Sequence, residues 1–346
     1  MNLKNTINKT YVINLKPRQD RWSQIKKDFK NIDLQLNRWN ATDGSKLSEN
    51  SINKITTPLC NQFCTNGIIG CWLSHFNIWK SIVKNKETNV LILEDDAIPI
   101  DNFEKEFLQG YNDLPNDWDL VFLGCYGSCE NNKFSNIFYE FLSNSKNTEL
   151  DINNYNSKFL FKPCFPLHMH AYLISYQGAL KLINNKALQK VSYHIDYTLS
   201  KSIISNKNIN FNMFAFKKPI VTQNISSEYS NLQMNTHPII AKYGSIIKFS
   251  DFYTLDSIGS IVVFSLRKYG LKINVFMVAM TILSFLLSFI NYNTIKTLNI
   301  ISCIYIIEYI TNKSKNQNQF DILVFEIFLL YASFYIGQQL RKILFI

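Results

Sequence analysis

The sequence predicts an α/β fold with a central, mainly parallel sheet, followed by a C-terminal region of apolar helices. Short apolar runs typical of buried strands alternate with amphipathic stretches of helical period through residues 10–230. One of these runs, Val90 to Leu93, ends abruptly in three adjacent carboxylates. Residues 275–290 are almost wholly apolar. We therefore expect three parts: a main domain over 1–240, a connecting segment over 241–270 and hydrophobic helices over 271–346.

The charge of the chain limits its partners. The 346 residues carry 36 basic and 26 acidic side chains, a formal net charge of +10. This charge suits an anionic partner such as a nucleotide, a phospholipid surface or nucleic acid. The basic residues are dispersed without a dense run, so we expect no nucleic-acid partner. The N-terminus is polar and shows no secretory signal.

The seven cysteines indicate a reducing compartment. Their odd number, without a signal sequence, favours free thiols. Two pairs, Cys60/Cys64 and Cys125/Cys129, have a spacing compatible with zinc half-sites. Neither pair has a convincing set of further Cys or His ligands, so ordinary buried or half-buried thiols are the favoured interpretation.

The chain begins with the pattern strand, helix, strand. Residues 10–15 are rich in β-formers, residues 18–30 have an amphipathic helical pattern, and a second strand is expected over 34–39. Arg18 and Arg21 follow the carboxyl end of the first strand, the edge at which a diphosphate can be gripped bidentately. The alternative is that both arginines decorate the exposed face of a helix.

A long helix is expected over residues 66–84, where apolar side chains recur at helical spacing. Gly70 lies within it and costs helix stability, so we expect another segment to approach closely there. Ser74 and His75 sit among the apolar positions. A lone histidine in such a place is more often a satisfied structural group than a ligand.

The three adjacent acids Glu94, Asp95 and Asp96 follow the buried strand directly. Their mutual repulsion is poorly screened at a strand end and is relieved if a cation binds there. A hard divalent ion often bridges one or two carboxylates to substrate phosphates, and ligands bind beyond the carboxyl ends of such strands. The alternative is a solvated acidic turn that caps a helix beginning near Asp101.

The remaining elements continue the α/β alternation. Asp196 falls in the first turn of a helix that opens at His194, where the helix dipole alone favours an acid. A long loop is expected over 130–157. We expect helices over 102–110, ended by Gly110, and 176–184, and strands over 119–123, 168–175, 209–216 and 220–225.

Together these segments resemble glycosyltransferase family 25, which includes lipopolysaccharide and collagen galactosyltransferases. The resemblance covers about residues 10–230 and depends on motifs that follow in one order, none of them decisive alone. They are Val12 to Leu15 with Arg18 and Asp20-Arg21, Ala41-Thr42-Asp43-Gly44, Gly67 to His75 with Ile78-Trp79-Lys80, Leu91 to Ala97, Ala171 to Ser175 with Gly178-Ala179, and Asp196.

The resemblance implies a GT-A-like nucleotide-sugar-binding domain that transfers a hexose, galactose or glucose, from a UDP-sugar with inversion. The acceptor would be a hydroxyl of a glycan, a lipid-linked glycan or a glycoprotein. It implies Mn²⁺ or Mg²⁺ held by Asp96 and Glu94, with Asp196 as the general base. Residues implied at the donor site are Asn14, Arg18, Arg21, Asp43, Ser74, His75, Glu94 and Asp95, and His237 is a further candidate metal ligand.

The chemistry accounts for these residue types. A departing UDP develops negative charge that a divalent cation neutralises, and oxygen ligands suit Mn²⁺ or Mg²⁺. The sugar passes through an oxocarbenium-like state, as in glycoside hydrolysis. Inversion by direct displacement needs one carboxylate to take the proton of the acceptor hydroxyl.

The C-terminal region departs from the family pattern. Three apolar runs cover residues 275–290, 298–310 and 322–337, and the last two contain Glu308 and Glu326. We expect membrane attachment, although the runs can also pack as a helical subdomain. If the first run spans, the basic residues before it place the main domain on the cytoplasmic side; they are Arg267, Lys268 and Lys272.

A second function class stays open. The chain can be a non-catalytic, membrane-anchored module that keeps the fold and binds a glycan or a partner. The intact acidic triplet argues against this alternative. The charge of +10 leaves nucleic-acid binding as a third hypothesis, which steep salt dependence would support.

Overall fold

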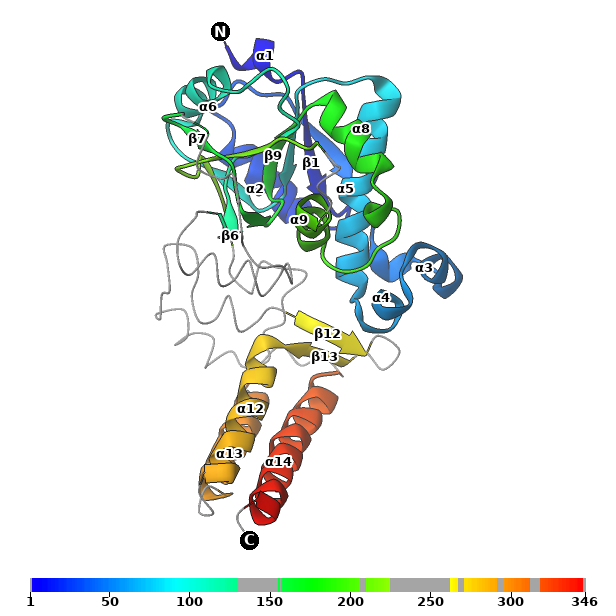
Figure 1. Ribbon diagram of the computed structural model, residues 1–346, viewed down its shortest axis with the longest axis vertical. Coiled ribbons are helices and arrows are strands. Elements are labelled where there is room, and N and C mark those ends of the chain that lie inside the picture. Colours follow the sequence, from blue (N-terminus) through cyan, green and yellow to red (C-terminus); the bar gives the residue numbers. More distant parts are fainter. Residues whose placement is uncertain are drawn as a thin grey trace. The chain divides into compact units, whose positions relative to one another are not determined.

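A computed structural model describes residues 2–129, 155, 157–205, 210–224, 262–266, 271–290, 295–311 and 318–344 (Figure 1). The chain divides into two compact units. Unit 1 comprises Met1–Asn61 and Asn66–Asn224, and unit 2 comprises Gln62–Thr65 and Ile225–Ile346. Each unit is described separately below.

Unit 1 is built on a seven-stranded sheet with the order β2-β1-β3-β9-β5-β10-β7. β1 pairs in parallel with β2 and β3, and β5 pairs in parallel with β10, whereas β9 and β7 pair antiparallel to their neighbours. The prediction of a mainly parallel sheet is confirmed. The strands are β1 (Lys9–Asn14), β2 (Leu36–Asn40), β3 (Val90–Glu94), β5 (Leu120–Phe122), β7 (Leu160–Phe161), β9 (Ala171–Ile174) and β10 (Met213–Phe216).

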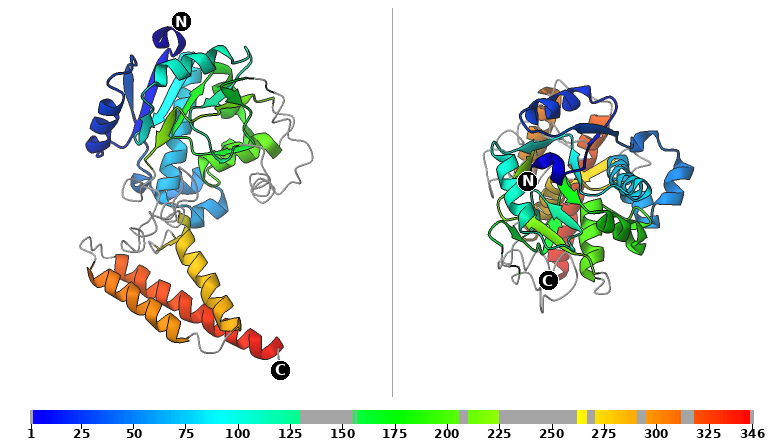
Figure 2. Two further views of the ribbon diagram at one scale, coloured as in Figure 1. Left: turned by 90° about the vertical axis from the view of Figure 1, so that its left-hand side faces the viewer. Right: turned by 90° about the horizontal axis from the view of Figure 1, so that it is seen from above.

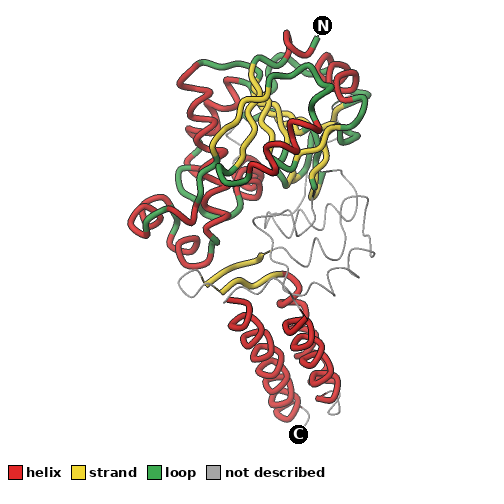
Figure 3. The backbone as a smooth tube through the Cα atoms, turned by 180° about the vertical axis from the view of Figure 1, so that it is seen from behind, coloured by secondary structure: helices red, strands yellow, loops and turns green. Residues whose placement is uncertain are grey.

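Helices cover both faces of this sheet (Figures 1 and 3). α2 (Gln19–Asp28) and α6 (Phe103–Asn112) share a buried core with Leu91 and Leu93 of β3. α5 (Asn66–Asn85) covers the opposite face, where α8 (Tyr176–Asn184) packs beside it, as the two views of Figure 2 also show. Because side chains alternate along a strand, odd and even positions of β3 face different helix layers.

The main elements of the prediction are present. α8 has the predicted bounds, and the first strand, helix and second strand appear as β1, α2 and β2. α9 (Ile195–Ser205) carries Asp196 in its first turn. The sequence did not predict β7, nor the smaller elements α1 (Leu3–Thr6), η1 (Gly44–Lys46), α3 (Glu49–Ile55), α4 (Pro58–Phe63), β4 (Ala97–Pro99), β6 (Tyr126–Ser128), β8 (Phe165–Leu167) and η3 (Lys186–Leu188).

One predicted helix end is wrong. α6 continues past Gly110 to Asn112. A Cβ at Gly110 would collide with the ring of Phe216 on β10. The glycine therefore serves the close approach of the helix to the sheet and does not end the helix.

The prediction of a close approach at Gly70 is confirmed. A Cβ there would lie 2.5 Å from the carbonyl oxygen of Thr42 and 2.9 Å from the amide nitrogen of Gly44. Ser74, one turn further along α5, accepts a hydrogen bond from the Thr42 N–H at 2.9 Å and donates one to the Gly70 carbonyl at 2.7 Å. The loop before η1 is thus seated on α5.

Two cysteine pairs correct the prediction of free thiols, and with it the argument from the cysteines for a reducing compartment. Cys125 and Cys129 form a disulfide, and Cys60 and Cys64 are also disulfide-bonded. The Cα atoms of Cys125 and Cys129 are 6.0 Å apart, within the range that a disulfide bridges. The chain reversal that brings them together cannot be read from their spacing.

Unit 2 contains the hairpin of β12 (Val262–Leu266) and β13 (Leu271–Asn274) and three helices. The predicted apolar runs lie in α12 (Val275–Ile290), α13 (Ile295–Thr311) and α14 (Asn318–Leu344), whose helical paths Figure 3 shows. Within the described residues one segment, Leu323–Leu344, is long and apolar enough to cross a membrane.

α12 and α14 approach each other closely. The Ser284 hydroxyl donates to the Leu330 carbonyl at 2.7 Å, and a Cβ at Gly337 would collide with Ser288. Ser284 and Ser288, four residues apart on α12, therefore face α14, where Gly337 allows a close approach of the kind seen at many helix contacts within membranes.

Candidate active site

The three acids of the triplet point to three different elements. Alternation along β3 sends Glu94 toward α5, on the side of Ile92, and sends Asp95 toward α2, on the side of Leu93. Asp96 follows the strand and meets β11 (Val221–Gln223), which pairs with β4. The three carboxylates therefore contact three different parts of the fold and do not form one patch of charge.

Asp95 is held in a buried ion pair. Its carboxylate accepts hydrogen bonds from Arg21 Nη1 at 2.9 Å and from Asn14 Nδ2 at 2.6 Å. The side chains of Arg21 and Asp95 are 5% and 9% exposed. Burial raises the pKa of Asp95 above its usual value, although Arg21 and Asn14 act in the opposite direction. Through these hydrogen bonds Asp95 connects the end of β3 to β1, which carries Asn14, and to α2, which carries Arg21.

Glu94 faces a buried chain of hydrogen bonds. Its Oε1 lies 3.2 Å from His75 Nε2, His75 Nδ1 lies 3.0 Å from the Tyr172 hydroxyl, and Trp79 Nε1–H donates to that hydroxyl at 2.9 Å. Since Trp79 can only donate, the Tyr172 hydrogen is available to Nδ1, and Nε2–H then donates to Glu94. Burial would raise the pKa of Glu94, but His75, with His170 and His168, lowers it below the usual value.

Asp96 carries the least compensated charge of the three. Its two oxygens accept from the Gln223 amide at 3.3 and 3.2 Å. Burial, together with the charges of Glu94 and Asp95, raises the pKa of Asp96 to about 8. A cation beside this carboxylate would stabilise its charged form and offset the effect of burial and of the neighbouring acids.

A continuous network joins Asp96 to Asp196. Gln223 donates to Asp96 and its Oε1 lies 2.9 Å from His168 Nδ1, while the His168 backbone N–H donates to Asp196 Oδ2 at 2.8 Å. The second oxygen of Asp196 accepts from the Tyr197 N–H at 2.7 Å. His168 has a φ of 65°, which a residue with a side chain rarely adopts and which is common at functional sites.

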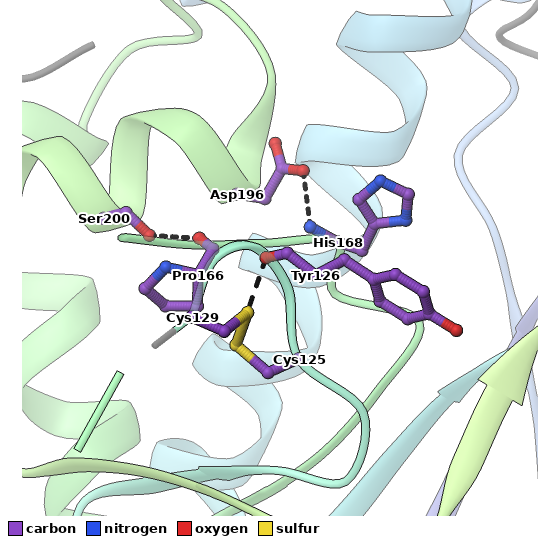
Figure 4. Close-up of a disulfide and its surroundings, with 7 residues drawn as sticks. All are labelled: Cys125, Tyr126, Cys129, Pro166, His168, Asp196 and Ser200. Atoms are coloured by element: carbon purple, nitrogen blue, oxygen red, sulfur yellow. Dashed lines mark hydrogen bonds between the residues drawn. A yellow bond between two sulfur atoms is a disulfide. The ribbon is translucent and has the colours of Figure 1, made fainter. Parts of the chain in front are cut away.

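The loop closed by the Cys125–Cys129 disulfide carries an aromatic side chain to this network (Figure 4). The Tyr126 ring stacks on His168 with centroids 4.9 Å apart and meets His170 edge to face at 5.1 Å. Burial raises the pKa of Tyr126 to about 12. Burial also lowers the pKa of His170 to about 4. The disulfide loop therefore packs against the network through Tyr126.

The other predicted site residues lie apart from this network. Arg18 pairs with Asp20 at 2.7 Å on the surface of α2. Asp43 caps η1 by accepting from the Ser45 N–H, and Ser74 anchors the preceding loop to α5. His237 lies outside the described residues. The donor-site roles of Arg18, Asp43 and Ser74 stay predictions.

Sequence reasoning missed five side chains of the site: Cys71, Tyr126, His168, His170 and Gln223. His168 and His170 carried a usable signal, because two histidines in alternation before a strand point to one face. Cys71 lies one turn before His75 on α5, and burial, with the charges of Glu94, Asp196 and Asp96, raises the pKa of its thiol well above the usual value. Tyr126 and Gln223 carried no signal.

Comparison with known proteins agrees with the resemblance seen in the sequence. The family model "Glycosyltransferase family 25 (LPS biosynthesis protein)" matches residues 7–199. A "Glycosyltransferase 25 family member" of Aedes aegypti is 29% identical over 193 residues, which is 52% of this chain and 28% of the relative. A "Procollagen lysyl hydroxylase and glycosyltransferase" of Acanthamoeba polyphaga mimivirus is 28% identical over 202 residues, 54% of this chain and 20% of that protein.

Shorter matches include "Procollagen galactosyltransferase 1-B" of Xenopus laevis, 32% identical over 133 residues, 35% of this chain and 22% of that protein. This chain spans less than a third of the length of the curated relatives that it matches. The matched stretch, residues 7–199, ends within α9 of unit 1 and includes both Asp96 and Asp196.

Proposed function

Because the chain belongs to glycosyltransferase family 25, we propose that unit 1 transfers a hexose from a UDP-sugar to a hydroxyl group, with inversion at the anomeric carbon. Galactose and glucose are the proposed sugars, and the acceptor is a glycan or a protein side chain. Unit 1 then works as a GT-A-type domain, with the donor beyond the carboxyl end of β3.

The observation that carries this proposal is the network from Asp96 through Gln223 and His168 to Asp196. Such a transfer uses acids that hold a cation for the leaving diphosphate, and a separate carboxylate that takes the proton of the acceptor hydroxyl. Two acids connected by three hydrogen bonds at one edge of a sheet support this division of roles.

A divalent metal ion fits this edge by charge and by donor chemistry. The carboxylate of Asp96 has a pKa of about 8 because burial and its acidic neighbours disfavour the charged form. Carboxylate oxygens are the donors that Mn²⁺ and Mg²⁺ prefer, and Asp96 with Glu94 would hold the ion. When bound, such an ion neutralises the charge that develops on a departing diphosphate.

The chain's own residues orient the acids. The His168 and Tyr197 backbone amides each donate to one oxygen of Asp196, which fixes its carboxylate plane. Each oxygen keeps a second lone pair, so Asp196 can still accept the proton of an acceptor hydroxyl. The same hydrogen bonds also suit a helix-capping role for Asp196. The activity of the Asp196→Asn variant distinguishes that role from the role of general base.

A donor screen tests the function. Hydrolysis and transfer of UDP-galactose, UDP-glucose and UDP-N-acetylglucosamine are measured with Mn²⁺ and with a chelator. We expect one UDP-hexose to be turned over only with the metal, and Asp196→Asn to reduce kcat by about 10²–10⁴ with unchanged UDP binding. If no donor is turned over, the proposed function is contradicted. If Asp196→Asn keeps full activity, the assignment of Asp196 as the general base is contradicted.

We propose that unit 2 attaches the protein to a membrane, with unit 1 on the cytoplasmic side. The large apolar side chains exposed on its helices and the length of Leu323–Leu344 support attachment. Lys272 and its basic neighbours in the sequence before α12 support the orientation. Such an anchor suits an acceptor that is itself membrane-bound.

The anchor is tested on the full chain in membrane vesicles. We expect the protein to resist carbonate extraction, and unit 1 to be cleaved by protease in inside-out vesicles but protected in right-side-out vesicles. Release by carbonate would contradict attachment, and the reverse protease pattern would contradict the orientation.

A further inference from the structure

We propose that Cys71, His75 and Glu94 form a binding site for a borderline divalent metal ion of the zinc class, next to Asp96. The inference concerns metal binding and does not depend on sugar transfer.

The ligand atoms already converge. Within the described residues, the Cys71 sulfur, a His75 ring nitrogen and a Glu94 carboxylate oxygen all lie within 4.8 Å of one another. Cys71 and His75 are four residues apart on α5 and therefore share one face of the helix, and Glu94 reaches that face from the end of β3. The His75 Nε2 to Glu94 Oε1 distance of 3.2 Å is close to the edge of a tetrahedron around an ion with bonds of about 2.0–2.1 Å.

The surroundings of His75 are those of a metal ligand. Histidine ligands nearly always have the second ring nitrogen fixed by another group, which sets the ring orientation. Here Nδ1 lies 3.0 Å from the Tyr172 hydroxyl, and Trp79 holds that hydroxyl from the other side. Because His75 is fully buried, its Nε2 has a fixed direction toward Glu94.

The proton and charge balance favours a divalent ion. The ion replaces the hydrogen between Nε2 and Glu94, and the single imidazole hydrogen then sits on Nδ1. The Tyr172 oxygen accepts it together with the Trp79 N–H, and the Tyr172 hydroxyl hydrogen rotates away from Nδ1. The Cys71 thiol releases its proton to solvent and binds as a thiolate. One thiolate, one carboxylate and one neutral imidazole balance the ion's charge of +2, in a region where Asp96 and Asp196 add further negative potential.

The donor set selects the kind of ion. A sulfur and an imidazole nitrogen favour Zn²⁺ and Co²⁺ over Mg²⁺ and Mn²⁺, which prefer oxygen. Three protein ligands leave a fourth position open to water or to a ligand, as in catalytic zinc sites. The second oxygen of Glu94 remains for the cation beside Asp96.

The test uses the full chain, stripped with a chelator and then titrated with Zn²⁺ or Co²⁺. We expect one ion per chain, one proton released per ion, and a near-ultraviolet absorption band from thiolate to Co²⁺. In the same wild-type protein, bound Zn²⁺ should protect Cys71 from alkylation, as mapped by mass spectrometry. This last measurement needs no variant to fold.

Variants assign the ligands. Cys71→Ser should abolish the thiolate band and weaken Zn²⁺ binding by about a hundredfold or more, and Tyr172→Phe should weaken it by about 10–100-fold. Cys303→Ser is the matched control, an exposed thiol on α13, and should change neither. Zn²⁺ binding that survives Cys71→Ser, absence of the band, or full displacement of Co²⁺ by equimolar Mn²⁺ would overturn the inference. Sugar transfer with Mn²⁺ would stand in each of these cases.

Discussion

The two units treat apolar surface in opposite ways. Among the described residues, unit 1 exposes two large hydrophobic side chains, Leu59 and Ile98, whereas unit 2 exposes fifteen. In unit 1 the buried Arg21 pairs with Asp95, and the buried Asp119 pairs with Lys181. Unit 2 buries small polar residues and some large apolar ones, such as Leu330 and Phe334, between its helices, but leaves many other large apolar side chains exposed.

The two units therefore obtain their stability from different surroundings. Unit 1 has a sheet covered by helices on both faces, so it gains from burial in water. An apolar outer surface of the kind seen on unit 2 marks a surface that something else covers, and we have proposed a lipid bilayer. All five tryptophans lie in unit 1, so tryptophan fluorescence reports on that unit alone. The comparison can therefore be tested one unit at a time.

The largest effect is expected from breaking the buried ion pair of unit 1. Arg21→Ala leaves the Asp95 charge buried without its partner, which should lower the free energy of unfolding by about 3–5 kcal/mol. Urea unfolding followed by tryptophan fluorescence measures this. Arg18→Ala, at an ion pair with a largely exposed Asp20, is the control and should cost about 0–1 kcal/mol. Equal losses in both variants would contradict the distinction.

The second-largest effect is expected on the rate of sugar transfer, with the fold unchanged. Asp96→Asn should reduce transfer by about 10²–10³, because the carboxylate that would hold the cation is gone. Its tryptophan unfolding transition should persist, since no ion pair is broken. Asp33→Asn, a surface acid paired with Lys4, should leave transfer unchanged. A fully active Asp96→Asn would show that this acid only shapes the turn.

A pH effect of about 3 kcal/mol is expected from His170. Its folded pKa of about 4 lies below the ordinary 6.5, so between these values the unfolded chain binds a proton that the native protein does not. Stability is therefore complete above pH 6.5 and falls as the pH drops toward 4, by about 3 kcal/mol from this group.

His170→Gln should remove that part of the acid destabilisation. Urea unfolding at pH 7 and at pH 4.5 gives the difference, and the partly exposed His194→Gln is the control. Identical losses on acidification in wild type and His170→Gln would show that other groups carry the effect.

The smallest effect is expected at the helix seam of unit 2. Gly337→Ala places a methyl group against Ser288 and should cost about 1–3 kcal/mol. Thermal loss of helicity in detergent should shift to lower temperature, while tryptophan fluorescence of unit 1 should not change. Ile336→Ala, at an exposed neighbouring position, should leave the thermal transition nearly unchanged.

The sequence predicted the order of the main elements because their patterns are local. The apolar run before Glu94, the helical period around Gly70 and the bounds of α8 needed no tertiary information. The partners of the three acids could not be predicted without tertiary information. Alternation along β3 separates Glu94 from Asp95, but which helix lies on each face depends on the whole sheet.

Arg21 and His168 show the same limit. Arg18 and Arg21 looked equivalent in sequence, and only packing of α2 on β3 buries one of them. His168 and His170 reach the site because β9 pairs antiparallel with β3, and Gln223 arrives from a strand more than a hundred residues after Asp96. Contacts of such range are set by topology and not by local pattern.

We have proposed that carboxylates at the end of β3 hold a cation that binds the donor's diphosphate. Calorimetric titration of UDP into the full chain, with Mn²⁺ and then with a chelator, tests it most directly. We expect UDP to bind at least about tenfold tighter with Mn²⁺, and the Asp96→Asn variant to gain no affinity for UDP from the metal. Equal UDP affinity with and without Mn²⁺, in wild type and variant alike, would contradict it.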